Sequence, residues 1–292
     1  MVGCRMQAST MVAPRSKINL LSLDETEMAG LVGELGWPAY RSGQILRWLY
    51  QRRVLSITDM TDLSRMDRTK LSGCATIART SHCVVFRSAD DTRKLRLKLE
   101  DGLEVEAVLI PDEDRLTLCL STQVGCTLDC GFCLTGRMGL KRNLKPHEII
   151  EQVLAAQEQL EDGERLSNMV FMGMGEPLAN LNALSEAVRR LTNRQWGLAW
   201  SPRRITVSTA GLASRMNELA PLGVNLAVSL NATTEEQRAR LMPAVSGIAP
   251  LKTLLAACRR YPLPPHRRLT FEYVLLAGVN DCEADAARLV KL

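Results

Sequence analysis

From residue 116 onward the sequence alternates between short apolar runs and longer segments with helical periodicity, and this alternation limits the possible folds more than any other feature. Strands that alternate with helices of this length are typical of βαβ units, in which consecutive strands run parallel. The sequence therefore predicts an α/β core with five parallel strands, and the chain ends inside a helix that would precede a sixth. The predicted strands are 116–121, 168–172, 204–208, 225–230 and 269–276, and the predicted helices are 146–161, 180–193, 213–220, 234–241, 250–260 and 282–291.

Three segments precede this core, which we assign to 116–292. Residues 1–18 show no periodicity and predict a disordered tail. Residues 19–80 carry apolar side chains at helical spacing and predict a small helical domain. Residues 81–115 alternate between apolar and polar and predict a β-meander linker, with a hairpin turn at Asp101-Gly102.

Composition places the chain among ordinary globular proteins. Of its 292 residues, 46% are hydrophobic and 24% are charged, and no run of eighteen apolar residues is present. The first residues lack the apolar core of a secretory signal, so we expect a cytoplasmic protein without membrane association. The formal charge of +5 permits a polyanionic partner such as RNA without showing one.

Basic residues of the predicted helical domain are candidates for RNA contacts, and a solvated helix surface accounts for them equally well. They are Arg41, Arg47, Arg52 and Arg53.

Nine cysteines in such a chain indicate metal binding or thiol chemistry, because disulfide frameworks belong to small secreted domains. Cys126, Cys130 and Cys133 form a C-x-x-x-C-x-x-C run directly after the first predicted strand of the core. Three thiolates on one loop suit three irons of a 4Fe–4S cluster and leave the fourth iron open. S-adenosylmethionine (SAM) can chelate that iron, and one electron then breaks a carbon–sulfur bond to give a 5′-deoxyadenosyl radical.

A zinc site and a purely structural role fit these three cysteines less well. A structural zinc site closes with four ligands, and no fourth cysteine or histidine follows closely, since His147 is fourteen residues beyond Cys133. Three unrelated buried cysteines would not be expected in one short loop that also holds Gly125 and Gly131. Phe132 is a candidate to pack against the adenine of SAM or, equally, a core aromatic residue.

Polar residues follow the next three predicted strands at the edge where the carboxyl ends of parallel strands meet. Gly175 allows close backbone approach, and Glu176 can accept a hydrogen bond from an ammonium group. Each segment alone would fit an ordinary turn or helix cap. Together they predict a SAM pocket, formed by Gly175, Glu176, Ser208, Ser229, Leu230 and Asn231.

Several stretches resemble the RlmN/Cfr family of radical SAM RNA methyltransferases, and the RlmN branch most closely. They are TLCLSTQVGCTLDCGFCLTGRMGLKRNLKPHEIIEQV from Thr117, VFMGMGEPLANL from Val170, ITVSTAG from Ile205, AVSLNA, RLMP and FEYVLLAGVND. The resemblance covers nearly all of the chain after the tail. It implies a partial (β/α)6 barrel preceded by a helical RNA-binding domain.

The resemblance implies methylation of C2 of a specific adenine in 23S rRNA and in tRNAs. In that family one SAM methylates a cysteine near the C-terminus, and a second SAM supplies the radical that activates the methyl group. Carried over, Cys126, Cys130 and Cys133 match the cluster ligands. Cys119 matches the cysteine that resolves the protein–RNA adduct by forming a disulfide, and Glu106 matches the proton acceptor. Without the resemblance, Cys119 would be interpreted as a buried strand cysteine and Glu106 as a surface carboxylate.

The resemblance further implies an electron donor such as flavodoxin and a monomeric protein. The basic residues Arg137, Lys141, Arg142 and Lys145 are candidates to bind phosphates, or they lie in a solvated loop.

The family's sixth strand and methyl-carrying cysteine would lie beyond Leu292, and neither Cys258 nor Cys282 matches that cysteine. We therefore expect a C-terminally truncated enzyme whose 292 residues alone do not methylate RNA. Two alternatives remain: a cluster- and RNA-binding protein without methyl transfer, and Cfr-type methylation at C8.

Overall fold

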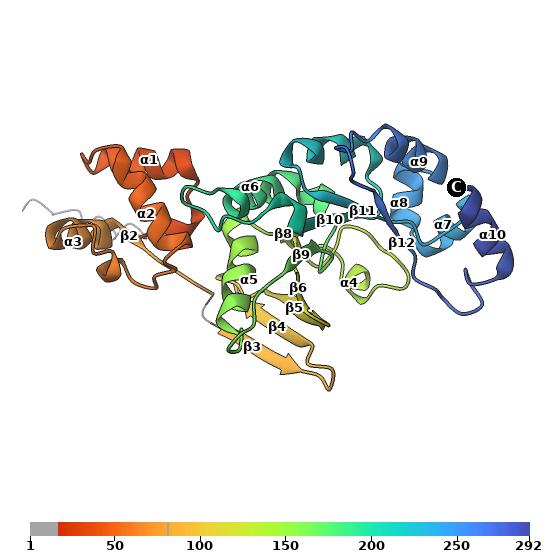
Figure 1. Ribbon diagram of the computed structural model, residues 1–292, viewed down its shortest axis with the longest axis horizontal. Coiled ribbons are helices and arrows are strands. Elements are labelled where there is room, and N and C mark those ends of the chain that lie inside the picture. The colour runs from red at the N-terminus through yellow and green to blue at the C-terminus, as the bar shows by residue number, and fades with distance from the viewer. Residues whose placement is uncertain (1–16, 81) are drawn as a thin grey trace, which may run out of the picture.

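The computed structural model describes residues 17–80 and 82–292, so the predicted tail lies almost wholly outside the described residues. The chain forms a helical N-terminal region at one end of the molecule and an α/β core that extends to the other end (Figure 1). None of the described helices is both long and apolar enough to cross a membrane.

The N-terminal region contains three α-helices with defined starts. Asp24 caps α1 by accepting from the Glu27 backbone N–H at 2.7 Å, and the Glu27 side chain accepts from Asp24 N in return. Ser64 caps α3 in the same position. The elements are β1 (Ile18–Asn19), η1 (Leu20–Ser22), α1 (Glu25–Glu34), α2 (Tyr40–Tyr50), η2 (Ile57–Asp59), α3 (Arg65–Cys74) and β2 (Ala75–Thr76).

A buried arginine of the core forms hydrogen bonds with this N-terminal region. Arg190 donates to the Leu21 carbonyl at 2.8 Å and to the Tyr50 hydroxyl at 3.1 Å, and its charge is paired with Glu186. Because a buried cation without partners is costly, these contacts fix the position of the helical region against α6.

One eight-stranded sheet runs through the core in the order β12-β11-β10-β9-β6-β5-β4-β3. The half from β6 to β12 is parallel, and the half from β3 to β6 is antiparallel. The strands are β3 (His82–Arg87), β4 (Arg93–Lys98), β5 (Glu104–Asp112), β6 (Arg115–Cys119), β9 (Asn168–Phe171), β10 (Ile205–Thr209), β11 (Asn225–Ser229) and β12 (Thr270–Glu272), and the short pair β7 (Gln123–Val124) and β8 (Arg142–Asn143) stands apart.

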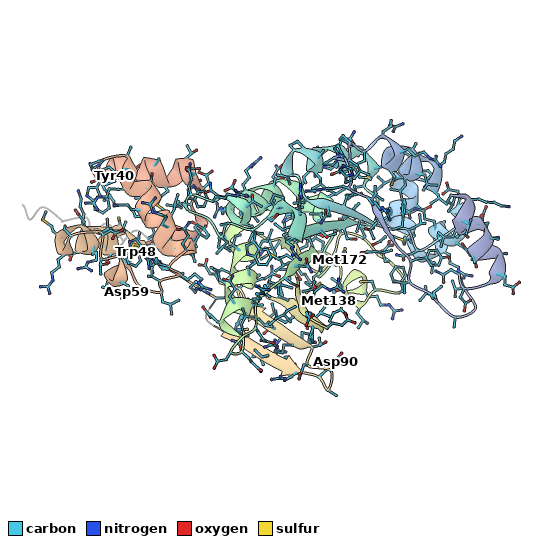
Figure 2. The ribbon with its side chains drawn as sticks, viewed as in Figure 1. Tyr40, Trp48, Asp59, Asp90, Met138 and Met172 are labelled. Atoms are coloured by element: carbon cyan, nitrogen blue, oxygen red, sulfur yellow. The ribbon has the colours of Figure 1, made fainter. Side chains whose placement is uncertain are left out.

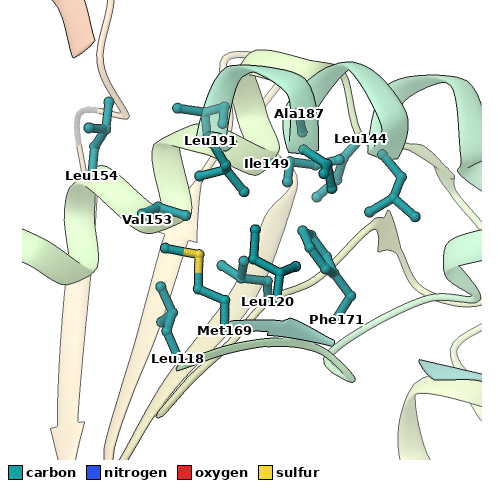
Figure 3. Close-up of a cluster of buried hydrophobic side chains, with 14 of the residues drawn as sticks. Leu118, Leu120, Leu144, Ile149, Val153, Leu154, Met169, Phe171, Ala187 and Leu191 are labelled. Carbon is teal, nitrogen blue, oxygen red and sulfur yellow. The ribbon is translucent and has the colours of Figure 1, made fainter. Parts of the chain in front are cut away.

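Helices follow the parallel strands, and α5 and α6 cover one face of the sheet. Figure 3 shows Leu118, Met169 and Phe171 of the strands packed against side chains of these two helices. The helices are α4 (Leu134–Arg137), α5 (Pro146–Glu158), η3 (Pro177–Asn180), α6 (Leu181–Thr192), η4 (Pro202–Arg204), η5 (Ala213–Leu222), α7 (Glu235–Leu241), α8 (Pro243–Ile248), α9 (Leu251–Arg260) and α10 (Glu283–Lys291).

The predicted alternation of strands and helices is confirmed. The fifth strand is shorter than predicted, since regular pairing ends at Glu272. Beyond it, Val274 N donates to the Asn231 side chain and Leu276 N to the Asn280 side chain, so side chains replace the sheet ladder. Helix α8 was not predicted, and the strands of the predicted linker continue the same sheet as the core.

Candidate functional site

The three cysteines of the C-x-x-x-C-x-x-C run lie on the loop between β7 and α4 and line one cavity of about 210 Å³. Gly125 precedes the loop with φ +76°, and a Cβ there would lie 1.8 Å from the Gly139 carbonyl oxygen. Only glycine fits this position, so the local sequence sets the path of the cysteine loop.

Burial opposes ionisation of two of these thiols. It raises the pKa of Cys130 to about 12, with further contributions from the charges of Cys126 and Cys133. Burial likewise raises the pKa of Cys126. Two buried thiols whose pKa values are both raised need a strongly cationic ligand to become thiolates together.

The donor set fits a 4Fe–4S cluster, because three thiolates at one cavity can each bind a different iron. No group of three or more histidine, cysteine, aspartate or glutamate side chains in residues 17–80 and 82–292 is arranged to surround a single metal ion.

Glu176 forms part of the cavity wall and is only 2% exposed. Its carboxylate accepts from Thr209 Oγ1 at 2.7 Å, from Ala210 N at 2.8 Å and from Leu178 N at 3.1 Å. Burial raises the pKa of Glu176, and these three bonds act against that rise. Gly175 lines the cavity beside it with φ +101°, and a Cβ there would lie 2.6 Å from Gln123 Cβ.

The ends of β10, β11 and β12 place three polar side chains together. Glu272 accepts from the hydroxyls of Ser208 and Ser229, both at 3.0 Å, and all three residues line the cavity. Glu272 was missed at the sequence level. Its position in the fifth predicted strand, next to strands whose polar ends predict the pocket, was the signal that could have found it.

Asn231 and Leu230 contribute in different ways. Asn231 lines the cavity with φ 53°, and its side-chain oxygen accepts from Val274 N at 2.9 Å. Leu230 is buried outside the cavity lining, and its backbone N–H donates to the Glu272 carbonyl at 2.9 Å. Leu230 therefore shapes the wall through its backbone.

The cavity has an unusual charge balance. Among the described residues that line it are two carboxylates and three thiols, and no lysine, arginine or histidine. Arg238 is buried close by, and it donates to the carbonyls of Ala210 and Leu230. The cavity therefore favours a ligand that carries positive charge.

Cys119 and Glu106 lie outside the cavity lining. Burial raises the pKa of Cys119 to about 11, a backbone hydrogen bond from Met172 lowers it, and the charge of Glu272 raises it further. Cys119 is thus next to one residue of the cavity lining, Met172, which Figure 2 labels. Glu106 is half-exposed on β5, and Lys94 Nζ lies 3.0 Å from its carboxylate.

Arg142, one of the candidate phosphate contacts, is already engaged. Its guanidinium donates to both carboxylate oxygens of Glu148 at 2.8 Å and to Asp101 at 2.5 Å. These bonds raise the pKa of Arg142 above its usual value. Arg142 therefore anchors the loop after the cysteines, and of the four candidates the structure gives it the clearest structural role.

Comparison with known proteins identifies two matching families. Residues 120–290 match the radical SAM superfamily, and residues 18–77 match the ribosomal RNA large subunit methyltransferase N-terminal domain.

Individual relatives agree with these matches. The dual-specificity RNA methyltransferase RlmN of Geobacter sulfurreducens is 52% identical over 93% of this chain and 74% of its own length. RlmN 2 of Myxococcus xanthus is 47% identical over 96% of this chain and 76% of its own length. The crystal structure of a radical SAM methyltransferase from Sphaerobacter thermophilus is 40% identical, with a TM-score of 0.86 over 94% of this chain and 81% of that one.

Proposed function

Because the chain belongs to the RlmN family of dual-specificity RNA methyltransferases within the radical SAM superfamily, we propose that it methylates C2 of a specific adenine in 23S rRNA and in tRNAs. The observation that carries the proposal is the cavity shared by three cysteines and two carboxylates, with no basic side chain in its described lining. SAM carries a positive sulfonium and an ammonium group, so this charge balance suits it.

Cys126, Cys130 and Cys133 would hold a 4Fe–4S cluster, which supplies the electron that breaks a carbon–sulfur bond of SAM. Glu176 would accept a hydrogen bond from the SAM ammonium group. Its Oε2 accepts one bond, from Ala210 N, and retains a free acceptor position. The backbone at Gly175 gives the close approach that this contact needs.

Ser208, Ser229, Asn231 and the Leu230 backbone would bind the ribose and the methionine carboxylate. Glu272 orients both serine hydroxyls by accepting from them, which leaves each hydroxyl oxygen free to accept from the cofactor.

Cys119 and Glu106 would act on the RNA at the edge of this cavity. The raised pKa of Cys119 keeps it a neutral thiol near pH 7, which protects it from alkylation and oxidation until a partner sulfur is positioned. Glu106 would accept the proton from the adenine ring, with Lys94 holding its carboxylate in place.

We further propose that the protein acts in the cytoplasm as a monomer and receives electrons from a small donor such as flavodoxin. The family to which the chain belongs supports this part of the proposal.

The test uses protein made from the complete reading frame, including any codons after Leu292. After cluster reconstitution it is incubated with SAM, a reductant and 23S rRNA, and the digested nucleosides are analysed by mass spectrometry. We expect 5′-deoxyadenosine and 2-methyladenosine. Formation of 8-methyladenosine would support the Cfr-type alternative, and 5′-deoxyadenosine with unmodified RNA would support the binding protein. Absence of 5′-deoxyadenosine would overturn the radical SAM assignment.

A further inference from the structure

Four side chains form a straight row across the antiparallel half of the sheet. Cys119 on β6 is opposite Val108 on β5, Val108 is opposite Lys94 on β4, and Lys94 is opposite Phe86 on β3. Directly opposed residues of antiparallel strands point to the same face. The row therefore leads from Cys119 to the outer edge of the sheet on one continuous face.

A second row lies beside the first on that face. Glu106 is opposite Arg96, and Arg96 is opposite Val84. The intervening residues, such as Leu95 and Leu97, are buried on the other face of the sheet. The residues proposed to act on RNA thus share their face with Phe86, Lys94 and Arg96, and we call these three the Phe86 platform.

The Phe86 platform presents an aromatic ring next to two cations. The ring is 46% exposed, Lys94 Nζ lies 5.5 Å from its centroid, and Arg96 Cζ lies 5.4 Å from it. Both cations come from β4, and β3 is at the edge of the sheet, so part of the Phe86 ring stays exposed. The exposed ring is therefore available to stack against another flat group.

Several features favour a nucleic-acid base as that group. Proteins bind unpaired bases on exposed aromatic side chains of sheets and bind the adjoining phosphates with lysine and arginine. Both cations also have acidic neighbours, since Lys94 pairs with Glu106 and Arg96 lies 3.6 Å from Glu104. A phosphate would therefore have to compete with these carboxylates for the two cations.

The distance between Phe86 and Cys119 is short enough for one RNA strand to contact both residues. Neighbouring strands lie about 4.8 Å apart, so Phe86 is roughly 14 Å from Cys119, which is about four stacked nucleotides at ~3.4 Å each. Lys94 links the two rows, because it contacts both the Phe86 ring and Glu106.

We propose that the Phe86 platform binds a nucleotide about four positions from the target adenine, with its base stacked on Phe86 and its phosphate contacted by Lys94 and Arg96. This inference rests on the proposed function, since it assigns a surface to the RNA substrate of the same site.

The test measures binding of a fluorescently labelled 23S rRNA fragment that contains the target adenine, by anisotropy. Phe86→Ala should weaken binding about tenfold, within the roughly five- to hundredfold range of a lost base–aromatic stack. Phe86→Tyr should retain wild-type affinity. Phe86→Leu keeps the apolar bulk but not the aromatic ring, so it should lose affinity even if the alanine variant folds poorly. Lys94→Gln and Arg96→Gln should each reduce the salt dependence by about one phosphate contact.

Phe271 on β12 provides a matched control. It is 45% exposed, but it lies on the strand at the opposite edge of the sheet, so Phe271→Ala should leave RNA affinity unchanged. Apart from Lys94→Gln, the variants should cleave SAM like the wild type when RNA is absent. If wild-type protein binds the RNA and Phe86→Ala and Phe86→Leu bind it equally well, the platform is refuted while the proposed function stands. If wild-type protein does not bind the RNA, the proposed function itself fails.

Discussion

The two halves of the central sheet differ in whether their functional side chains are enclosed or exposed, although all eight strands form one hydrogen-bonded sheet. In the parallel half, strand ends and following loops enclose a cavity of about 210 Å³ whose described lining lacks basic residues. In the antiparallel half, the face that carries Glu106 is open and presents charged pairs around Phe86.

The connections between strands account for this difference. A parallel connection must cross over, so each strand end is followed by a loop that can close a pocket at one edge. A hairpin connection adds no such cover, and one face of an antiparallel sheet can remain open. The parallel half therefore suits a small cofactor that must be shielded from water, and the antiparallel half suits a large substrate.

Removal of a proposed cluster ligand should have the largest effect, and it should impair the functions of the parallel half without impairing RNA binding. Cys130→Ala removes one of three thiolates from the cavity, so bound iron and SAM cleavage should be lost, whereas RNA affinity should change less than about twofold. Iron analysis, visible absorption and anisotropy measure the three quantities. Cys74→Ser, in the helical N-terminal region, serves as the control and should retain iron. If Cys130→Ala lost RNA binding as completely as it lost iron and SAM cleavage, the two halves would not act independently.

A smaller change tests the charge of the cavity. Glu272→Gln keeps an acceptor for the serine hydroxyls but removes one of the two carboxylate charges of the cavity lining. Charges a few ångströms apart are worth a few kcal/mol at an effective dielectric constant of about 20, and partial exposure reduces this. The preference for SAM over neutral S-adenosylhomocysteine should fall about tenfold, ~1.4 kcal/mol, as measured by calorimetry.

Ser229→Ala is the matched control for that charge. It removes a hydrogen-bonding group but no charge, so it should weaken both ligands to a similar extent. If Glu272→Gln also weakened both equally, the carboxylate would act only as a hydrogen-bond acceptor.

The third prediction concerns stability and the pH at which it is lost. Asp285, at the start of α10, accepts from Thr233 at 2.8 Å, from Gln237 at 2.6 Å and from Arg288. Hydrogen bonds from Cys282, Gln237, Thr233 and Arg288 lower the pKa of Asp285. Because the folded pKa is depressed, the resulting stability is present above the unfolded value of about 3.8 and is lost as pH falls through the folded pKa.

Asp285→Asn should therefore lower the Tm at pH 7, and the difference from wild type should shrink below about pH 3.8 in thermal unfolding monitored by circular dichroism. Glu104→Gln in the antiparallel half should change the Tm far less, because its pair with Arg96 is exposed. Equal changes of Tm in the two variants would show that the buried and the exposed carboxylate contribute equally to stability.

The fold was predictable where hydrophobic periodicity was strong. The first four strands of the parallel half lie close to their predicted ranges because each is a buried apolar run. The end of β12 was not predictable. The backbone N–H groups after it donate to the side chains of Asn231 and Asn280 instead of to a neighbouring strand, and these contacts form only in the folded protein.

The candidate site shows the same limit. The cysteine spacing and the Gly175-Glu176 turn are local in sequence, so the residues alone pointed to a cavity that the structure forms. Glu272 depends on register, because it is opposite Ser229 only once β11 and β12 pair. Cys119 and Glu106 came from family resemblance alone, as an isolated strand cysteine or surface carboxylate carries no chemical signal of its own.

The smallest expected effect comes from a cysteine of the parallel half that lies outside the cavity. Cys258 on α9 packs against the hydrophobic core, and burial raises its pKa to about 11, so it remains a neutral thiol near pH 7. Cys258→Ser should leave bound iron and SAM cleavage unchanged and cost no more than ~1 kcal/mol of unfolding free energy in urea titration. We expect a cysteine to bind iron only if it lines the cavity. Burial elsewhere in the parallel half is not sufficient. Loss of iron in Cys258→Ser would break that argument, because the cavity lining would then no longer define the set of ligands.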